Sequence, residues 1–242
     1  MKTLFAFTAT VASTLVLSPC FAGPKEDIQA ALGRLAEAPN YAWTTRTQVE
    51  GSQFQSSDIH GKAQKEGWAV VTQERDGTRT VAVFKGENGV VQADGAWHSA
   101  EDLRGQRQGG GGGGAFRAGM LLRTRTPLDE AKRALGHIKE WKASADGLGG
   151  DLTEAGAREM MAFGRGGRGG GAGGAAEARD AKGSVRYWLK DGQLAKIQVK
   201  VSGTYSFNNN DRFVERTTTY ELKEIGTTTV EIPAAAKTKL GS

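Results

Sequence analysis

The first hundred residues of the chain alternate between one helical pattern and several strand patterns. Residues 24–36 carry apolar side chains at Ile28, Ala31, Leu32 and Leu35, the spacing of an amphipathic helix that begins near Pro24. A period of two then takes over, with turn-forming sequences at 74–78, 86–89 and 94–95. This half is predicted to be an antiparallel meander of about five strands, including residues 41–49, 68–72, 81–84 and 90–93.

The middle of the chain returns to a helical pattern. Thr126, Pro127 and Asp129 supply an N-cap, a proline in the first turn and an acidic residue. The apolar stripe that follows predicts a four-turn helix through Leu128, Ala131, Leu135, Ile138 and Trp141. A second, shorter helix is expected over 151–163, capped by Asp151.

The last third again has the strand period. The Asp191-Gly192 pair is a strong hairpin signal between two alternating segments. Strands are expected over 185–190, 197–207, 213–224 and 227–232, followed by a last helical turn over 234–240. Since the strands come in runs without βαβ alternation, the chain is predicted to be α+β, an antiparallel sheet with helices packed on one face.

The first 22 residues have the features of a secretory signal. Lys2 precedes an uncharged apolar stretch over 4–17, and Cys20-Phe21-Ala22 forms a small-x-small cleavage site. The apolar stretch is too short to span a bilayer. We therefore expect a signal peptide over 1–22 and a single domain over 23–242, exported to the periplasm or secreted.

Cys20 also belongs to a sequence that looks like a lipobox, Leu17-Ser18-Pro19-Cys20, although Pro19 fits that motif badly. A soluble exported protein is favoured, with a form lipidated at Cys20 as the alternative. Cleavage after Ala22 would leave no cysteine, which excludes a disulfide, a thiol nucleophile and a thiolate metal site.

Glycine accounts for 35 of the 242 residues, and two windows explain the excess. Residues 105–119 hold 8 glycines and residues 147–174 hold 12. Segments 103–128 and 160–176 also carry seven arginines and no acidic residue. Without Lys2 and these arginines, 24 basic side chains remain against 27 acidic ones, so the insertions alone make the protein basic.

Catalytic and metal-binding patterns are missing from the sequence. His60, His98 and His137 are far apart, and none belongs to a His-x-x-x-His pair. The sequence has no Gly-x-Ser-x-Gly elbow, and its glycine runs lack the order of a phosphate-binding loop. We therefore expect no enzyme activity, no cofactor and no metal.

The insertions at about 105–119 and 164–174 look like Arg-Gly-Gly boxes. Three interpretations remain open: flexible loops kept soluble by arginine, a surface for anionic lipid or an envelope polymer, and a nucleic-acid site. Export argues against nucleic acid, because little RNA is expected outside the cytoplasm.

The two strand-rich ends carry recognisable sequence patterns. Residues 187–194 follow the pattern x-Trp-Leu-x-x-Gly-x-Leu, and residues 226–233 follow Gly-Thr-Thr-x-Val-x-[Ile/Val]-Pro. Tyr41-Ala42-Trp43 opens the meander, and Gly95-Ala96-Trp97 closes a hairpin. In these patterns the chain resembles LolA/LolB-like periplasmic proteins. The resemblance covers 24–100 and 183–240, while the glycine-rich insertions depart from the family pattern.

This resemblance implies a strongly curved antiparallel sheet, an open half-barrel, with helices as a lid over its concave apolar face. Relatives use that cavity for acyl chains of lipoproteins or lipids, or to sense envelope components, without catalytic residues. A carrier would bind a lipid or other amphipathic ligand. The competing interpretation is a structural or sensory envelope protein with a packed core. Its basic loops would contact an anionic polymer, a protein partner or, peripherally, the membrane surface. The oligomeric state stays open.

The candidate ligand-binding residues of this chain form two groups. The apolar candidates come from the strand faces and the helical lid: Trp43, Trp68, Val70, Phe84, Leu128, Leu135, Ile138, Trp141, Tyr187, Leu189, Val199, Val201 and Tyr205. The candidates for an anionic headgroup or partner are Arg104, Arg107, Arg117, Arg165 and Arg168.

Overall fold

The computed structural model describes residues 23–52, 56–108, 113–144, 147–162, 178–207 and 210–241. One helix and a six-stranded meander form the first half: α1 (Pro24–Glu37), β1 (Asn40–Val49), β2 (Ile59–Gln64), β3 (Trp68–Arg75), β4 (Thr78–Lys85), β5 (Asn88–Ala93) and β6 (Ala96–Ser99). The second half contains α2 (Ala100–Gln108), α3 (Gly113–Leu121), α4 (Pro127–Leu135), β7 (Lys142–Ser144), β8 (Gly147–Asp151), α5 (Glu154–Met161), β9 (Arg179–Lys190), β10 (Gln193–Phe207), β11 (Asn210–Lys223) and α6 (Ala234–Lys239).

The described strands form one antiparallel sheet. Its order is β6-β5-β4-β3-β2-β1-β11-β10-β9-β8-β7, so the first and last strands of the chain meet in the middle. In that pairing Trp43 lies opposite Leu222, and Thr45 lies opposite Tyr220. The sheet is open, because β6 and β7 are not paired with each other. The predicted α+β fold with an open antiparallel sheet is confirmed.

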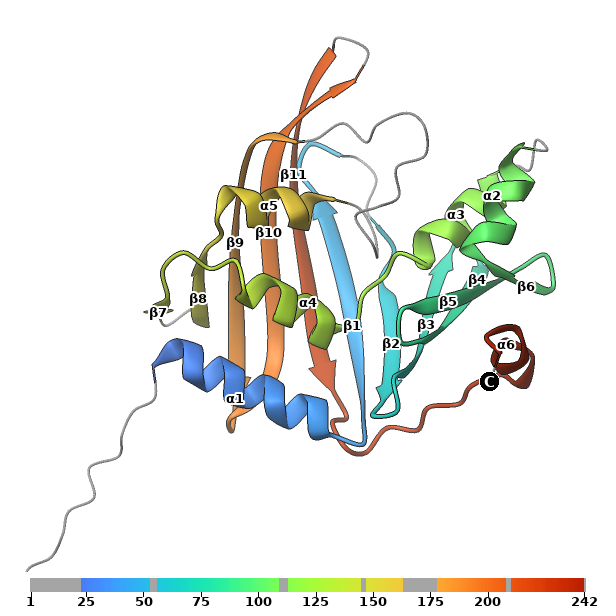
Figure 1. The fold of residues 1–242 in the computed structure, drawn as a ribbon, viewed down its shortest axis with the longest axis horizontal. Coiled ribbons are helices and arrows are strands. Elements are labelled where there is room, and N and C mark those ends of the chain that lie inside the picture. Colours follow the sequence, from blue (N-terminus) through green and yellow to red (C-terminus); the bar gives the residue numbers. More distant parts are fainter. Residues whose placement is uncertain are drawn as a thin grey trace, which may run out of the picture.

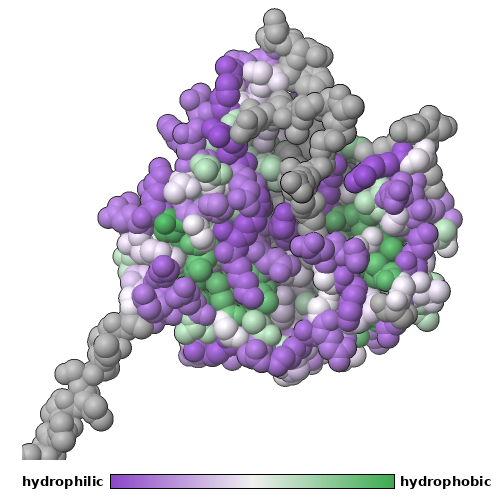
Figure 2. Space-filling model, viewed as in Figure 1, coloured by the Kyte–Doolittle hydropathy of each residue, from purple (hydrophilic) through white to green (hydrophobic). Residues whose placement is uncertain are grey.

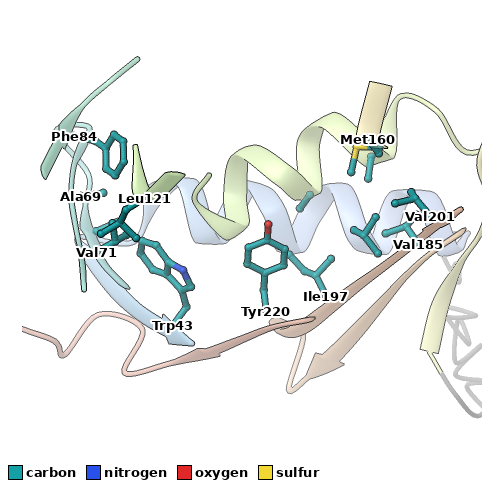
Figure 3. Packing of buried hydrophobic residues seen from close by; sticks show 14 of the residues in the cluster. Trp43, Ala69, Val71, Phe84, Leu121, Met160, Val185, Ile197, Val201 and Tyr220 are labelled. Carbon is teal, nitrogen blue, oxygen red and sulfur yellow. The ribbon is translucent and has the colours of Figure 1, made fainter. Parts of the chain in front are cut away.

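Helices α1 to α5 lie on one side of the curved sheet. Figure 1 shows α1, α4 and α5 across β1, β11, β10 and β9, and α2 with α3 over the other end of the sheet. We call the helix-covered side the concave face. A single apolar cluster fills it, with Trp43, Tyr187 and Ile197 fully buried. Figure 3 shows Tyr220 and Ile197 pointing from the strands toward the helices.

Several local signals produce the expected elements. α1 has Pro24 in its first turn and buries Ile28, Ala31, Leu32 and Leu35, as its spacing predicts. The hairpin turn at Asp191-Gly192 has both residues at positive φ, 51° and 74°. The Asp76-Gly77 and Asp94-Gly95 turns have the same signature, which matches the right-handed twist of the flanking strands.

A second apolar cluster lies on the opposite, convex face. Trp68, Val83 and Val90 are buried there against Ala236 of α6. The segment after β11 crosses this side of the sheet, and the Lys62 ammonium donates to the Thr229 carbonyl at 3.1 Å. The expected strand over 227–232 is therefore wrong: β1 already pairs with β2 and β11, and this segment runs outside the sheet.

Two predictions for the middle of the chain are also wrong. The helix expected through Trp141 ends at Leu135 with Gly136 as its C-cap, and Ile138 pairs with Leu152 in an isolated β-bridge. The next helix is capped by Thr153, whose hydroxyl accepts the Gly156 N–H at 3.0 Å. Asp151 is the last residue of β8, where it pairs with Ser184 of β9.

The first glycine-rich insertion contains helices. α2 runs to Gln108 and α3 begins at Gly113, with Ala115, Ala118 and Leu121 buried. The remainder of that insertion, residues 109–112, lies outside the described residues. The second insertion at 164–174 and the expected signal peptide with Cys20 lie outside them as well.

Candidate functional site

A groove of about 540 Å³ opens at one end of the concave face. It lies between the end of α1, the start of α4 and the turns that join β2 to β3 and β4 to β5. The two turns are tied together, because the Gly86 N–H donates to the Gly67 carbonyl at 2.9 Å. Figure 2 shows hydrophobic surface along the seam between α1 and α4, next to this groove.

Apolar side chains from four elements form the floor of the groove. Leu35 comes from α1, Tyr41 from β1, and Ala63 and Ala69 from β2 and β3. Leu128 of α4 lies over them and is only partly buried. An apolar ligand segment placed here would contact aliphatic carbon on several sides.

Tyr41 links the floor to the start of α4. The residue is 5% exposed, and its ring centroid lies 5.6 Å from that of the Trp43 ring. Burial raises the pKa of the Tyr41 hydroxyl, and hydrogen bonding to the Thr126 side chain and the Leu128 backbone opposes part of that rise. The phenol is therefore neutral at physiological pH.

The N-cap of α4 positions the residues at the rim. The Thr126 hydroxyl accepts the Asp129 N–H at 3.2 Å and donates to the Asp129 carboxylate at 2.7 Å. This confirms the cap predicted from Thr126-Pro127-Leu128-Asp129. Because Leu128 and Lys132 are four residues apart, the cap directs both toward the groove.

The rim carries charges of both signs. Lys65, Arg125 and Lys132 line the groove together with Glu87 and Asp129. Lys65 forms a 2.5 Å ion pair with Glu37, and this ammonium lowers the pKa of the Glu37 carboxyl. Arg125 lies 3.7 Å from Glu130.

Beneath α4 lies a buried polar cluster. The Glu130 side chain is within 3.7 Å of both Arg125 and Arg133, and the residue is 8 % exposed. Burial raises the pKa of the Glu130 carboxyl, while Arg133, Arg125 and Arg216 oppose the rise. Arg216 on β11 donates to the Met160 carbonyl at 2.6 Å, which ties the sheet to α5.

Hydrogen bonds hold the two lid helices on the sheet and to each other. The Tyr187 hydroxyl donates to the Ala131 carbonyl at 3.0 Å. Glu159 of α5 contacts Arg133 at 2.6 Å and the Nε2 atom of His137 at 2.9 Å. Arg133 and His137 lower the pKa of this carboxyl, whereas its partial burial opposes them. α4 and α5 therefore form one connected lid.

Most of the predicted cavity residues lie in the packed core. Eleven of the thirteen belong to the concave cluster, either buried within it or packed against it: Trp43, Phe84, Leu128, Leu135, Ile138, Trp141, Tyr187, Leu189, Val199, Val201 and Tyr205. Leu128 also lines the groove. Trp68 and Val70 belong to the convex cluster, although Trp68 borders the groove at the start of β3.

The predicted headgroup arginines lie elsewhere. Arg104 and Arg117 are exposed on α2 and α3 and do not line the groove. Arg107 is in the last turn of α2, and Arg165 and Arg168 lie outside the described residues. The basic residues at the rim are Lys65, Arg125 and Lys132, which the sequence reasoning missed. Of these three residues, only Arg125 lies beside a recognisable sequence feature, because it directly precedes the N-cap of α4.

The described residues contain no group of three His, Cys, Asp or Glu side chains that could hold a metal ion. His60 contacts the Thr44 hydroxyl at 3.2 Å, and His137 contacts Glu159. Within the same part of the chain, every helix is too short or too polar to cross a membrane.

Comparison with known proteins gives distant structural likenesses only. No protein-family model matches the chain, and no curated protein matches it. LprF from Mycobacterium bovis is similar at 13% identity and a TM-score of 0.41, over 88% of this chain and 97% of that one. The lipoprotein LppX from Mycobacterium tuberculosis is similar at 11% identity and a TM-score of 0.40, over 87% and 98%.

A LolA superfamily protein from Nitrosomonas europaea is similar at 11% identity and a TM-score of 0.33, over 84% of this chain and 94% of that one. Likenesses this distant say nothing about a ligand of this chain.

Proposed function

We propose that the chain is an exported, non-enzymatic binding protein of the bacterial envelope that holds the apolar part of an amphipathic ligand, such as a lipid acyl chain. The groove beside α4 carries this proposal. Its volume of about 540 Å³ lies within the ~300–1,000 Å³ usual for small-molecule sites. The ligand's apolar segment would lie against Leu35, Tyr41 and Leu128, with a polar or anionic headgroup near Lys132.

Simple energetics indicate that both parts of the ligand are needed. Each buried methylene contributes about 0.8 kcal/mol, so a segment of about eight methylenes contributes roughly 6 kcal/mol. Association costs at least ~4 kcal/mol of lost freedom. A micromolar dissociation constant corresponds to a binding free energy of about −8 kcal/mol and therefore requires further contacts at the headgroup. Arg125 and Lys132 are placed to supply them.

The filled core favours a second candidate function. Trp43, Tyr187 and Ile197 have no exposed surface, so a ligand would reach them only if α4 moved off the sheet. A structural or sensory envelope protein with a permanently packed core would have the same interior. Its basic glycine-rich segments would then contact an anionic polymer or a protein partner.

Titration with a fluorescent fatty acid tests the groove directly. Leu128→Gln places a polar amide in the groove and should weaken binding by about tenfold. Leu135→Gln is the matched control, because Leu135 is on the same helix and partly buried but does not line the groove. Equal binding by both variants and the unsubstituted protein would remove the groove as the site. No binding by any of the three would favour the packed structural protein.

A further inference from the structure

The outward face of α3 exposes a pair of large apolar side chains. Phe116 is 57% exposed and Met120 is 42% exposed, and they are two of the three large hydrophobic side chains exposed among the described residues. They are four residues apart, so they are neighbours on one side of the helix. The opposite side of α3 buries Ala115, Ala118 and Leu121.

Packing on the sheet fixes this orientation. Leu122, directly after α3, is 8% exposed and reaches Gly89 of β5. A Cβ atom at Gly89 would lie 3.2 Å from Leu122 and 2.7 Å from Phe84, so the glycine allows the close approach. Because the inner side of α3 is held in the core, Phe116 and Met120 point outward whenever the domain is folded.

Exposed arginines flank the apolar pair in the sequence. Arg117 on α3 and Arg123 just after it are both exposed, as is Arg104 on α2. Segment 103–128 contains five arginines and no acidic residue. The nearest acidic side chains in the sequence are Glu101 and Asp102 before this segment and Asp129 after it. Asp102 is paired with Lys239, and Asp129 takes part in the N-cap of α4.

We infer that this face of α3 binds the surface of an anionic lipid bilayer. Phe116 and Met120 would enter the interfacial region, and Arg117 and Arg123 would contact lipid phosphates. A helix with an apolar face flanked by arginines binds membranes through these two contributions together. This inference stands independently of the groove and its ligand.

The size and chemistry of the face favour a membrane over other partners. Two partly exposed side chains offer at most a few hundred Å² of apolar area, well below the ~800 Å² that each partner contributes to a stable protein interface. Single-stranded nucleic acid would use the arginines, but Met120 would gain nothing from a polyanion in water. A bilayer accepts both at once, and binding by one short helix would be reversible.

Sedimentation with lipid vesicles tests the inference. The purified protein should sediment with phosphatidylcholine vesicles that contain phosphatidylglycerol and should stay in solution with phosphatidylcholine alone. The double variant Phe116→Ser with Met120→Ser should bind about tenfold more weakly. Arg117→Gln and Arg123→Gln should each cost about fivefold, and high salt should release the protein.

Phe213→Ser provides the matched control. Phe213 is 65% exposed on β11, and Figure 1 shows β11 and α3 in different parts of the molecule. This variant should bind like the unsubstituted protein. All substituted side chains are exposed, so circular dichroism should show unchanged folding. Failure of the unsubstituted protein to sediment, equal binding by the double variant, or an equal loss in Phe213→Ser would each overturn the inference.

Discussion

Gly61 on β2 is the position where adding a single methyl group should damage the core most directly. The Trp43 ring of the neighbouring strand lies flat against this glycine. A Cβ atom at residue 61 would be 2.1 Å from two ring carbons and 2.5 Å from a third. These separations are far below van der Waals contact, so Gly61→Ala requires the ring or the strand to move.

Trp43 has little freedom to move. It has no exposed surface and belongs to the concave cluster, where Figure 3 shows it beside Val71 and Leu121. Overpacking a close-packed core costs about 1–3 kcal/mol, and a clash with a fully buried indole belongs at the upper end. We expect Gly61→Ala to lower the free energy of unfolding by about 2–3 kcal/mol.

Urea unfolding, followed by circular dichroism, measures this loss. The matched control is Gly33→Ala on α1, where an added Cβ meets nothing within 4 Å. This exposed helical position should gain about 0.5–1 kcal/mol from the same substitution. The two variants should therefore shift the midpoint in opposite directions at an unchanged denaturant slope. A Gly61→Ala protein as stable as the unsubstituted one would refute the account of Trp43 packing.

Two further predictions concern the lid and the convex side. Tyr187→Phe removes the hydrogen bond to the Ala131 carbonyl. This variant should lower the free energy of unfolding by about 1 kcal/mol in the same urea assay. An unchanged free energy would mean that the bond does not stabilise the lid. The pKa of Asp102 is lowered from 3.8 to about 2 by the Ser99 N–H and by Lys239, so its stabilisation is complete above about pH 4 and is lost as the pH falls toward 2. Asp102→Asn should flatten that part of the pH profile of unfolding, and an unchanged profile would contradict the assignment.

Local chemistry made part of this fold predictable. The proline start of α1, the Thr126 cap of α4 and the Asp191-Gly192 turn each depend on residues within a few positions of one another. For the same reason the alternating faces of β9 and β10 were predicted correctly. Val185 and Tyr187 are buried together, as are Val199 and Val201.

Non-local packing decided what the sequence left open. Both faces of β3 are apolar, and the pattern cannot say that Ala69 and Val71 face the helices while Trp68 faces α6. Ile138 continues a helical stripe, yet it pairs with Leu152 because Gly136 ends α4 first.

The groove was equally hidden in the sequence. Lys65 and Arg125, sixty residues apart in sequence, line the same groove once α4 lies beside the β2–β3 turn. Such a site becomes visible only in three dimensions.

The central claim is that the groove beside α4 holds an amphipathic ligand. Mass spectrometry of an organic extract from the protein, purified without detergent from its native host, tests it most directly. The account predicts a lipid or other acyl compound in the extract, strongly reduced in Leu128→Gln and retained in Leu135→Gln. An extract free of such compounds from the unsubstituted protein would contradict it.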